Sequence, residues 1–293
     1  MLATEELIII CLLLVIVYLL FLLSAKNRQL NKVTTEPQAV PVETSIPAAQ
    51  TKIIMFGEFR MVNPEGTDVH HNLTPKLKEL LLVLILYTFR KSNWEKGIPI
   101  KRLDEFLWSN ISYDNLKNNR TVNISKLKKV LADIPELKII NENNHLTISF
   151  DGKVFCDYVE IKKISNKFRT HNSLTEEEEQ IFLGIIEQGS FLRDINHDWL
   201  DEIKIELNEE VSDIFEYFAN KLMHNGDDKQ LYKIGKLFYN FDPLSETALK
   251  IIVKVYHRQG KHGSAKDVYQ HYKNEYLKTF GEEYKAGYNE LMN

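Results

Sequence analysis

The stretch that decides the fold is NNRTVNISKLKKVL, which runs from Asn118 to Leu131. One side of it carries a stripe with helical spacing, made of Leu116, Arg120, Ile124, Leu127, Leu131 and Ile134. The other side carries amides, hydroxyls, ammonium groups and one small apolar group, on Asn118, Asn119, Thr121, Val122, Ser125, Lys126 and Lys129. Such side chains hydrogen-bond base edges and phosphates, so we expect a helix that packs on a core and reads DNA in a major groove. The alternative is a basic amphipathic helix whose polar side is only solvated.

Length and charge divide the chain into unlike parts. With 293 residues and 44% hydrophobic content, it is long enough for two modest domains. The net charge of -4 splits into -1 for residues 1–51, +4 for residues 52–165 and -7 for residues 166–293. A basic middle beside an acidic end fits a nucleic-acid-binding module joined to one that does not touch DNA. The two cysteines, Cys11 and Cys156, exclude a disulfide framework and fit a reducing compartment.

An apolar run near the start predicts a membrane anchor over residues 1–26. Leu7 to Leu23 is uninterrupted by polar residues and is long enough to cross a bilayer. Glu5 and Glu6 precede it, whereas a cleaved signal peptide begins with positive charge and has a shorter apolar core. Basic residues follow it at Lys26, Arg28 and Lys32. The positive-inside rule therefore predicts a single-pass protein of the cell inner membrane, with everything after the span in the cytoplasm.

Residues 27–51 contain three prolines and no helical period, so they are expected to form a flexible linker with a reach of about 25 to 30 Å. Residues 52–165 then predict a small β component around three helices. KIIMFGEFRMV and TDVHHNLT, separated by the turn 63–66, are expected to form a strand pair or a small antiparallel sheet. Thr74 and Pro75 begin a helix that reaches about Arg90, a second helix covers Ile100 to Trp108, and the third begins near Tyr113.

Two alternating runs, LKII and LTISF, surround the polar segment NENNH and predict a β-hairpin. Sheet, three helices and hairpin are the order of a winged helix-turn-helix domain. The tip residues Asn143 and Asn144 are then placed to meet DNA, although an ordinary surface turn would use asparagine as well.

The last part, residues 166–293, is predicted to be helical throughout. Its helices are expected at 175–188, 199–225, 229–241, 245–259 and 263–280. Pairs separated by breaks such as Phe241-Asp242-Pro243 indicate TPR-like repeats. The aromatic residues of this half are interpreted as packing between repeat helices.

Several segments resemble a known family. FGEFRMV, LTPKLKELLLVLILY, the pair Leu107-Trp108, NNRTVNISKLKKVL and FCDYVEIKKI are similar to the DNA-binding domain of SARP/AfsR-type bacterial transcriptional regulators, whose winged helix is of the OmpR type. GSFLRDINHDWLDEIKIEL, FDPLSETALKIIVKVYHRQGKHGSAKDVYQHY and LKTFGEE resemble the bacterial transcriptional activation domain that follows it. The family has leucine where this chain has Arg120, and arginine where it has Lys126 and Lys128. The latter change replaces bidentate donors with point charges.

These observations predict a membrane-anchored, sequence-specific regulator of transcription that binds double-stranded DNA. The candidate DNA contacts are Lys117, Asn119, Arg120, Thr121, Val122, Ser125, Lys126, Lys128, Lys129, Asn143 and Asn144. The helical repeats are expected to bind RNA polymerase or a second copy of the chain, and a membrane sensor is a possible further partner. The alternative is a membrane-tethered adaptor whose winged helix no longer binds DNA.

An enzyme is not expected, because the sequence has no phosphate-binding glycine loop, nucleophile elbow or HExxH motif. Three histidines, His257, His262 and His271, lack paired cysteine or acidic ligands at metal-binding spacing. We therefore predict neither a metal site nor a cofactor.

Overall fold

The computed structural model describes residues 50–90, 97–151, 154–225 and 227–292. The described residues belong to one compact unit, which extends from Thr44 to Asn293. The predicted anchor at Leu7 to Leu23 and nearly all of the predicted linker lie outside the described residues. Among the residues that are described, no helix has both the length and the apolar character needed to cross a membrane.

The first sheet has three strands in the order β2-β1-β6. They are β1 (Thr51–Ile54), β2 (Arg60–Val62) and β6 (Val154–Cys156). β2 runs antiparallel to β1, and β6 runs parallel to it with Ile53 opposite Cys156. The predicted strand pair was therefore wrong in its second strand, TDVHHNLT. The chain reverses inside KIIMFGEFRMV, where Gly57 has a φ of 80°, while TDVHHNLT supplies only an isolated bridge and the short 3-10 helix η1 (His70–Asn72).

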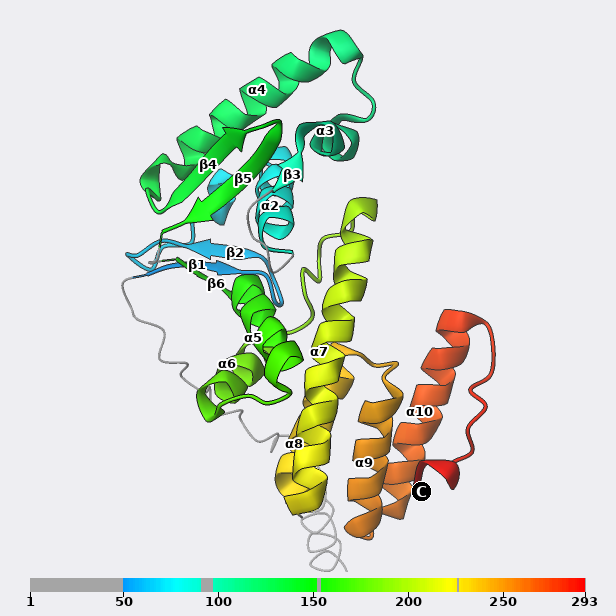
Figure 1. The fold of residues 1–293 in the computed structure, drawn as a ribbon. Coiled ribbons are helices and arrows are strands. Elements are labelled where there is room, and N and C mark those ends of the chain that lie inside the picture. Colours follow the sequence, from blue (N-terminus) through cyan, green and yellow to red (C-terminus); the bar gives the residue numbers. More distant parts are fainter. Residues whose placement is uncertain (1–49, 91–96, 152–153, 226, 293) are drawn as a thin grey trace, which may run out of the picture. The chain divides into compact units, whose positions relative to one another are not determined.

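Three helices and a second sheet complete the winged helix (Figure 1). The helices are α2 (Pro75–Phe89), α3 (Ile100–Trp108) and α4 (Tyr113–Val130), followed by the 3-10 turn η2 (Leu131–Asp133). As predicted, the Thr74 side chain caps α2 by accepting a hydrogen bond from the Leu77 N–H at 3.4 Å, and Pro75 occupies the first turn. The second sheet, in the order β3-β5-β4, consists of β3 (Ile98–Pro99), β4 (Leu137–Glu142) and β5 (His145–Phe150).

The predicted hairpin is confirmed, with a tighter turn than the NENNH pattern suggested. β4 and β5 pair as far as Glu142 and His145, so the turn consists of Asn143 and Asn144 alone. Their φ angles of 49° and 60° are left-handed, as a two-residue turn of type I′ requires. Asparagine tolerates this conformation better than other residues with a side chain.

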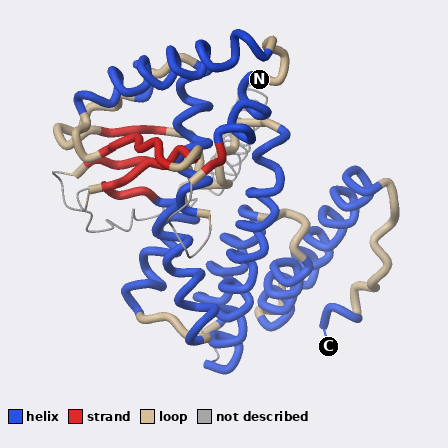
Figure 2. The backbone as a smooth tube through the Cα atoms, turned by 45° about the horizontal axis from the view of Figure 1, so that its top comes forward, coloured by secondary structure: helices blue, strands red, loops and turns tan. Residues whose placement is uncertain are grey.

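The rest of the chain is helical, as predicted (Figures 1 and 2). Its elements are α5 (Asp157–His171), α6 (Glu176–Ile186), α7 (Asp198–Asn225), α8 (Asp228–Phe241), α9 (Glu246–Arg258), α10 (His262–Phe280) and η3 (Glu290–Met292). Ser245 begins α9 by accepting a hydrogen bond from the Ala248 N–H at 3.2 Å. α5 was not among the predicted helices, and the predicted domain boundary between residues 165 and 166 falls inside it.

The aromatic residues of the helical half pack between helices, as the sequence indicated. Phe215 of α7 stacks on Phe238 of α8 with their ring centroids 4.4 Å apart, and Tyr232 of α8 contacts Tyr256 of α9. A single cluster of buried residues runs from Ile53 in the first sheet to Ala248 in α9. The winged helix and the first helices that follow it therefore share one core.

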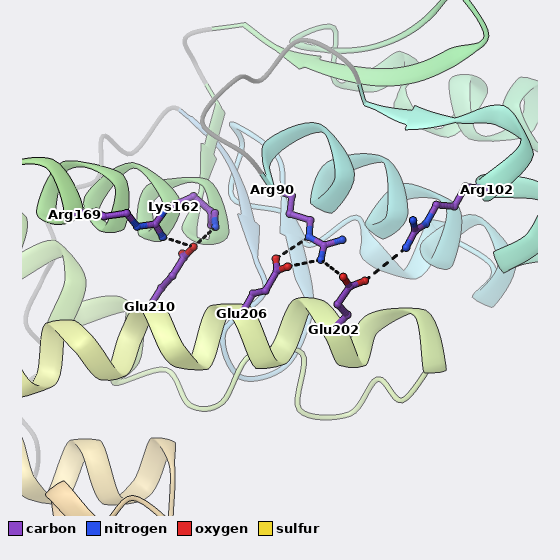
Figure 3. A network of polar contacts seen from close by, with 7 residues as sticks. All are labelled: Arg90, Arg102, Lys162, Arg169, Glu202, Glu206 and Glu210. Atoms are coloured by element: carbon purple, nitrogen blue, oxygen red, sulfur yellow. Dashed lines mark hydrogen bonds and ion pairs between the residues drawn. The ribbon is translucent and has the colours of Figure 1, made fainter.

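A polar network also joins the two halves along one side of α7 (Figure 3). Arg90, at the end of α2, donates to Glu206 at 2.7 Å and lies 2.8 Å from a carboxylate oxygen of Glu202. One turn further along, Glu210 accepts from two cations of α5, Lys162 at 2.6 Å and Arg169 at 3.0 Å. The Lys162 side chain is 6% exposed and the Arg169 side chain is 65% exposed, so only the first ion pair is shielded from water.

This difference in exposure leads to a prediction about stability. Lys162→Ala is expected to lower the free energy of unfolding by about 3 kcal/mol, because it leaves the Glu210 carboxylate, which is only 12% exposed, without its shielded partner. Arg169→Ala, which removes the exposed cation from the same carboxylate, is expected to cost at most about 1 kcal/mol. Urea unfolding of both variants measures the difference, and equal losses would show that burial does not decide the strength of this network.

Candidate nucleic-acid interface

The apolar stripe predicted from the sequence forms the inner side of α4, which packs against the core. Leu127 and Leu131 are buried, and so is Ile134 in the connection to β4. Leu116 and Ile124 are partly buried and pack against the same core. The burial of these residues confirms the predicted inner side of the helix. The opposite side of the helix therefore faces solvent.

Arg120, a candidate DNA contact, lies on the inner side of the helix. Its guanidinium forms an ion pair with Asp104 of α3, and the two side chains are only 16% and 15% exposed. Asp104 Oδ1 is buried and has no hydrogen-bond partner among the described residues. Arg120 therefore holds α4 against α3. The sequence pattern placed Arg120 on the stripe but gave no sign of this partner.

The outer side of α4 carries most of the other candidates. The exposed ones are Lys117, Thr121, Val122, Ser125, Lys126, Lys128 and Lys129. No ion pair involving the four lysines is found within the described part of the chain. Asp114 is the one acidic residue in the sequence of α4, so this helix presents a positive surface.

Three polar side chains of α4 donate hydrogen bonds to the helix itself. Asn119 Nδ2 donates to the Asn115 carbonyl at 3.0 Å, and Asn123 Nδ2 donates to the Asn119 carbonyl at 2.8 Å. The Thr121 hydroxyl donates to the Lys117 carbonyl at 2.8 Å. Reading adenine requires both groups of an asparagine amide, so Asn119 has to rotate away from the helix before it can make that contact.

The hairpin tip is fixed beside the start of α3. The Asn144 carbonyl accepts a hydrogen bond from the Ile100 N–H at 2.9 Å, and the Asn143 carbonyl lies 2.8 Å from His145 Nδ1. Both asparagine side chains are exposed. A surface hollow of about 840 Å³ brings Asn144 together with Lys117 and Arg120. The same hollow is lined by Lys101 of α3, an exposed cation that lies outside the predicted recognition helix.

No metal site accompanies this surface in the structure that is described: no group of three or more His, Cys, Asp and Glu side chains there could hold an ion. The rings of His257 and His262 do lie close, with centroids 4.6 Å apart. Two neighbouring imidazoles without a third ligand do not make a structural zinc site.

The order of sheet, three helices, hairpin and further helices defines a winged helix joined to a helical half. No family model matches the chain, and no curated protein matches it either. Among solved structures, the chain is similar to EmbR of Mycobacterium tuberculosis, which was solved in complex with a low-affinity phosphopeptide. The TM-score is 0.58 at 14% sequence identity, and the match covers 83% of this chain and 64% of the EmbR chain. The likeness shows a shared fold over less than two thirds of EmbR.

Proposed function

We propose that the protein is a sequence-specific DNA-binding regulator of transcription, in which α4 enters the major groove and the β4–β5 hairpin meets the adjacent backbone. The observation that carries this proposal is the outer side of α4. Four lysines without ion-pair partners in the described structure surround exposed hydroxyl, amide and apolar groups, on a helix whose inner side is buried. Lysines of this kind attract phosphates, while the shorter side chains can reach base edges.

The paired helices α7 to α10 offer a surface for RNA polymerase or for a second copy of the chain, because repeat helices commonly bind proteins. That EmbR was solved with a phosphopeptide supports a protein partner for a chain of this fold. The apolar run Leu7 to Leu23 would hold the protein at the inner membrane, with the winged helix in the cytoplasm and within reach of a membrane sensor.

The experiment that tests DNA binding uses the compact unit Thr44–Asn293 and fluorescence anisotropy with duplex DNA selected from a random-sequence library. The wild type is expected to bind with an affinity that falls steeply as salt rises. The double variant Lys126→Ala, Lys129→Ala is expected to bind more weakly, with the slope of log affinity against log salt reduced by about two.

A matched control removes two exposed lysines far from α4 in the sequence, by Lys236→Ala and Lys266→Ala. This control is expected to keep the wild-type affinity and slope. If the wild type enriches no sequence and shows no salt-sensitive binding to any duplex, the regulator is ruled out and the adaptor becomes the better description.

A further inference from the structure

Val122 stands out on α4 because it is an apolar side chain exposed in the middle of the polar outer side. It is 41% exposed, whereas the stripe on the other side of the helix is buried or partly buried. On a helix, the neighbours of Val122 on its own side are the residues three and four positions away, which are Asn118, Asn119, Ser125 and Lys126. An isolated apolar group at the centre of a polar surface gains free energy only when a partner covers it.

The chemistry of the major groove limits what that partner can be. Its floor consists of hydrogen-bond donors and acceptors, apart from the C5-methyl group of thymine, which is the apolar feature that distinguishes one base pair from the others. The branched methyl groups of valine match it, because contact between two methyl groups removes apolar surface from water on both sides. Valine can neither donate nor accept a hydrogen bond, so it gains nothing over the polar edges of guanine, adenine or cytosine.

From this position we infer that Val122 is a specificity-determining residue that selects a pyrimidine carrying a 5-methyl group, which in unmodified DNA is thymine. The inference rests on the proposed function, since it requires α4 to lie in the major groove. It assigns a base preference to one side chain, whereas the lysines beside it act on phosphates whatever the sequence.

The test deletes the methyl group from the DNA and the valine from the protein. In the selected duplex, each thymine is replaced in turn by deoxyuridine, which keeps every hydrogen-bonding group and loses only the methyl. At one position, the wild type is expected to bind the thymine duplex about three to five times more tightly than the uridine duplex, the effect of one buried methyl group. Val122→Ala is expected to bind the two duplexes equally well. Alanine is a better helix former than valine at an exposed position, so the variant should fold.

Two further arms make the result specific. Lys128→Ala is expected to weaken binding to both duplexes while keeping the thymine-to-uridine ratio of the wild type, which separates base selection from general attraction. At the same position, the affinities for a cytosine duplex and a 5-methylcytosine duplex are compared, to find whether the methyl group is recognised on either pyrimidine or on thymine alone. Preference for 5-methylcytosine equal to that for thymine over uridine supports recognition of the methyl group alone.

The outcomes separate this inference from the proposed function. If no duplex is bound, the proposed function fails and the inference fails with it. If a sequence is selected and bound but no uridine substitution changes the affinity, or if Val122→Ala keeps the ratio, the inference is overturned while DNA binding stands.

Discussion

Gly57→Ala is expected to be among the most destabilising single substitutions in this protein, lowering the free energy of unfolding by about 4 kcal/mol or more. A Cβ atom at this position would lie 2.4 Å from the carbonyl oxygen of Gln188, which belongs to the backbone and cannot move aside cheaply. The φ of 80° at Gly57 adds the strain that an L-amino acid has in the left-handed region.

The close approach exists because two distant segments join here. The Gly57 N–H donates to the Ser190 carbonyl at 2.9 Å, and the Leu192 N–H donates to the Met55 carbonyl at 2.7 Å. Phe56 and Phe191 form a β-bridge between these bonds, and their rings lie 5.4 Å apart. Displacing the backbone at Gly57 would therefore separate the winged helix from the segment that leads into α7.

Gly66 provides a matched control for the effect of φ. Its φ of 83° is nearly the same, but a Cβ atom there would meet nothing within 4 Å. Gly66→Ala is expected to cost only about 1 to 2 kcal/mol, the strain of the left-handed conformation without the clash. Urea denaturation followed by circular dichroism gives both values, and equal losses for the two variants would show that the contact with Gln188 contributes nothing.

Local patterns were sufficient to predict most of the helices. The cap and proline at Thr74-Pro75 located the start of α2, and the spacing of Leu127 and Leu131 identified the inner side of α4. Such signals act over three or four residues, so they can be read without knowing what packs against them.

Features that depend on distant partners could not be predicted in the same way. The parallel pairing of β1 with β6 joins residues about a hundred positions apart, and the three residues of β6 are too few to show a strand pattern. The ion pair between Arg120 and Asp104 could not be predicted either, because a charge on an apolar stripe does not reveal which residue neutralises it. The residues on the outer side of α4 could be predicted from the sequence, whereas the partner of Arg120 could be identified only from the structure.

Asp157 is a further residue whose contribution to stability can be recognised only from the structure. It is the first residue of α5 and is 2% exposed. Its Oδ2 atom accepts hydrogen bonds from the N–H groups of Met55 at 2.7 Å and Phe56 at 2.8 Å, and its Oδ1 atom accepts from Tyr158 N–H at 2.7 Å. One carboxyl group therefore fastens the end of β1 to the beginning of α5.

Asp157→Ala is expected to lower the free energy of unfolding by about 4 kcal/mol, because it leaves three backbone N–H groups without an acceptor, two of them in a buried loop. Asp157→Asn keeps the shape and one acceptor oxygen, so we expect it to cost roughly half as much. Equal unfolding midpoints for the alanine variant and the wild type would contradict this account of how β1 and α5 are joined.

The dependence on pH follows from the burial of the same group. Burial raises the pKa of Asp157 to about 7 from a usual value of 3.8, while the three N–H donors and Arg60 limit the rise. The folded protein therefore binds this proton more tightly than the unfolded chain does, so the part of the stability that comes from protonation of Asp157 is fully present below pH 3.8 and is lost as the pH rises through about 7. Asparagine does not titrate, and the stability advantage of the wild type over Asp157→Asn is accordingly expected to shrink between about pH 4 and pH 7. Urea unfolding of both proteins across this range measures the change, and an advantage that grows with pH would show that the carboxylate is the form the fold prefers.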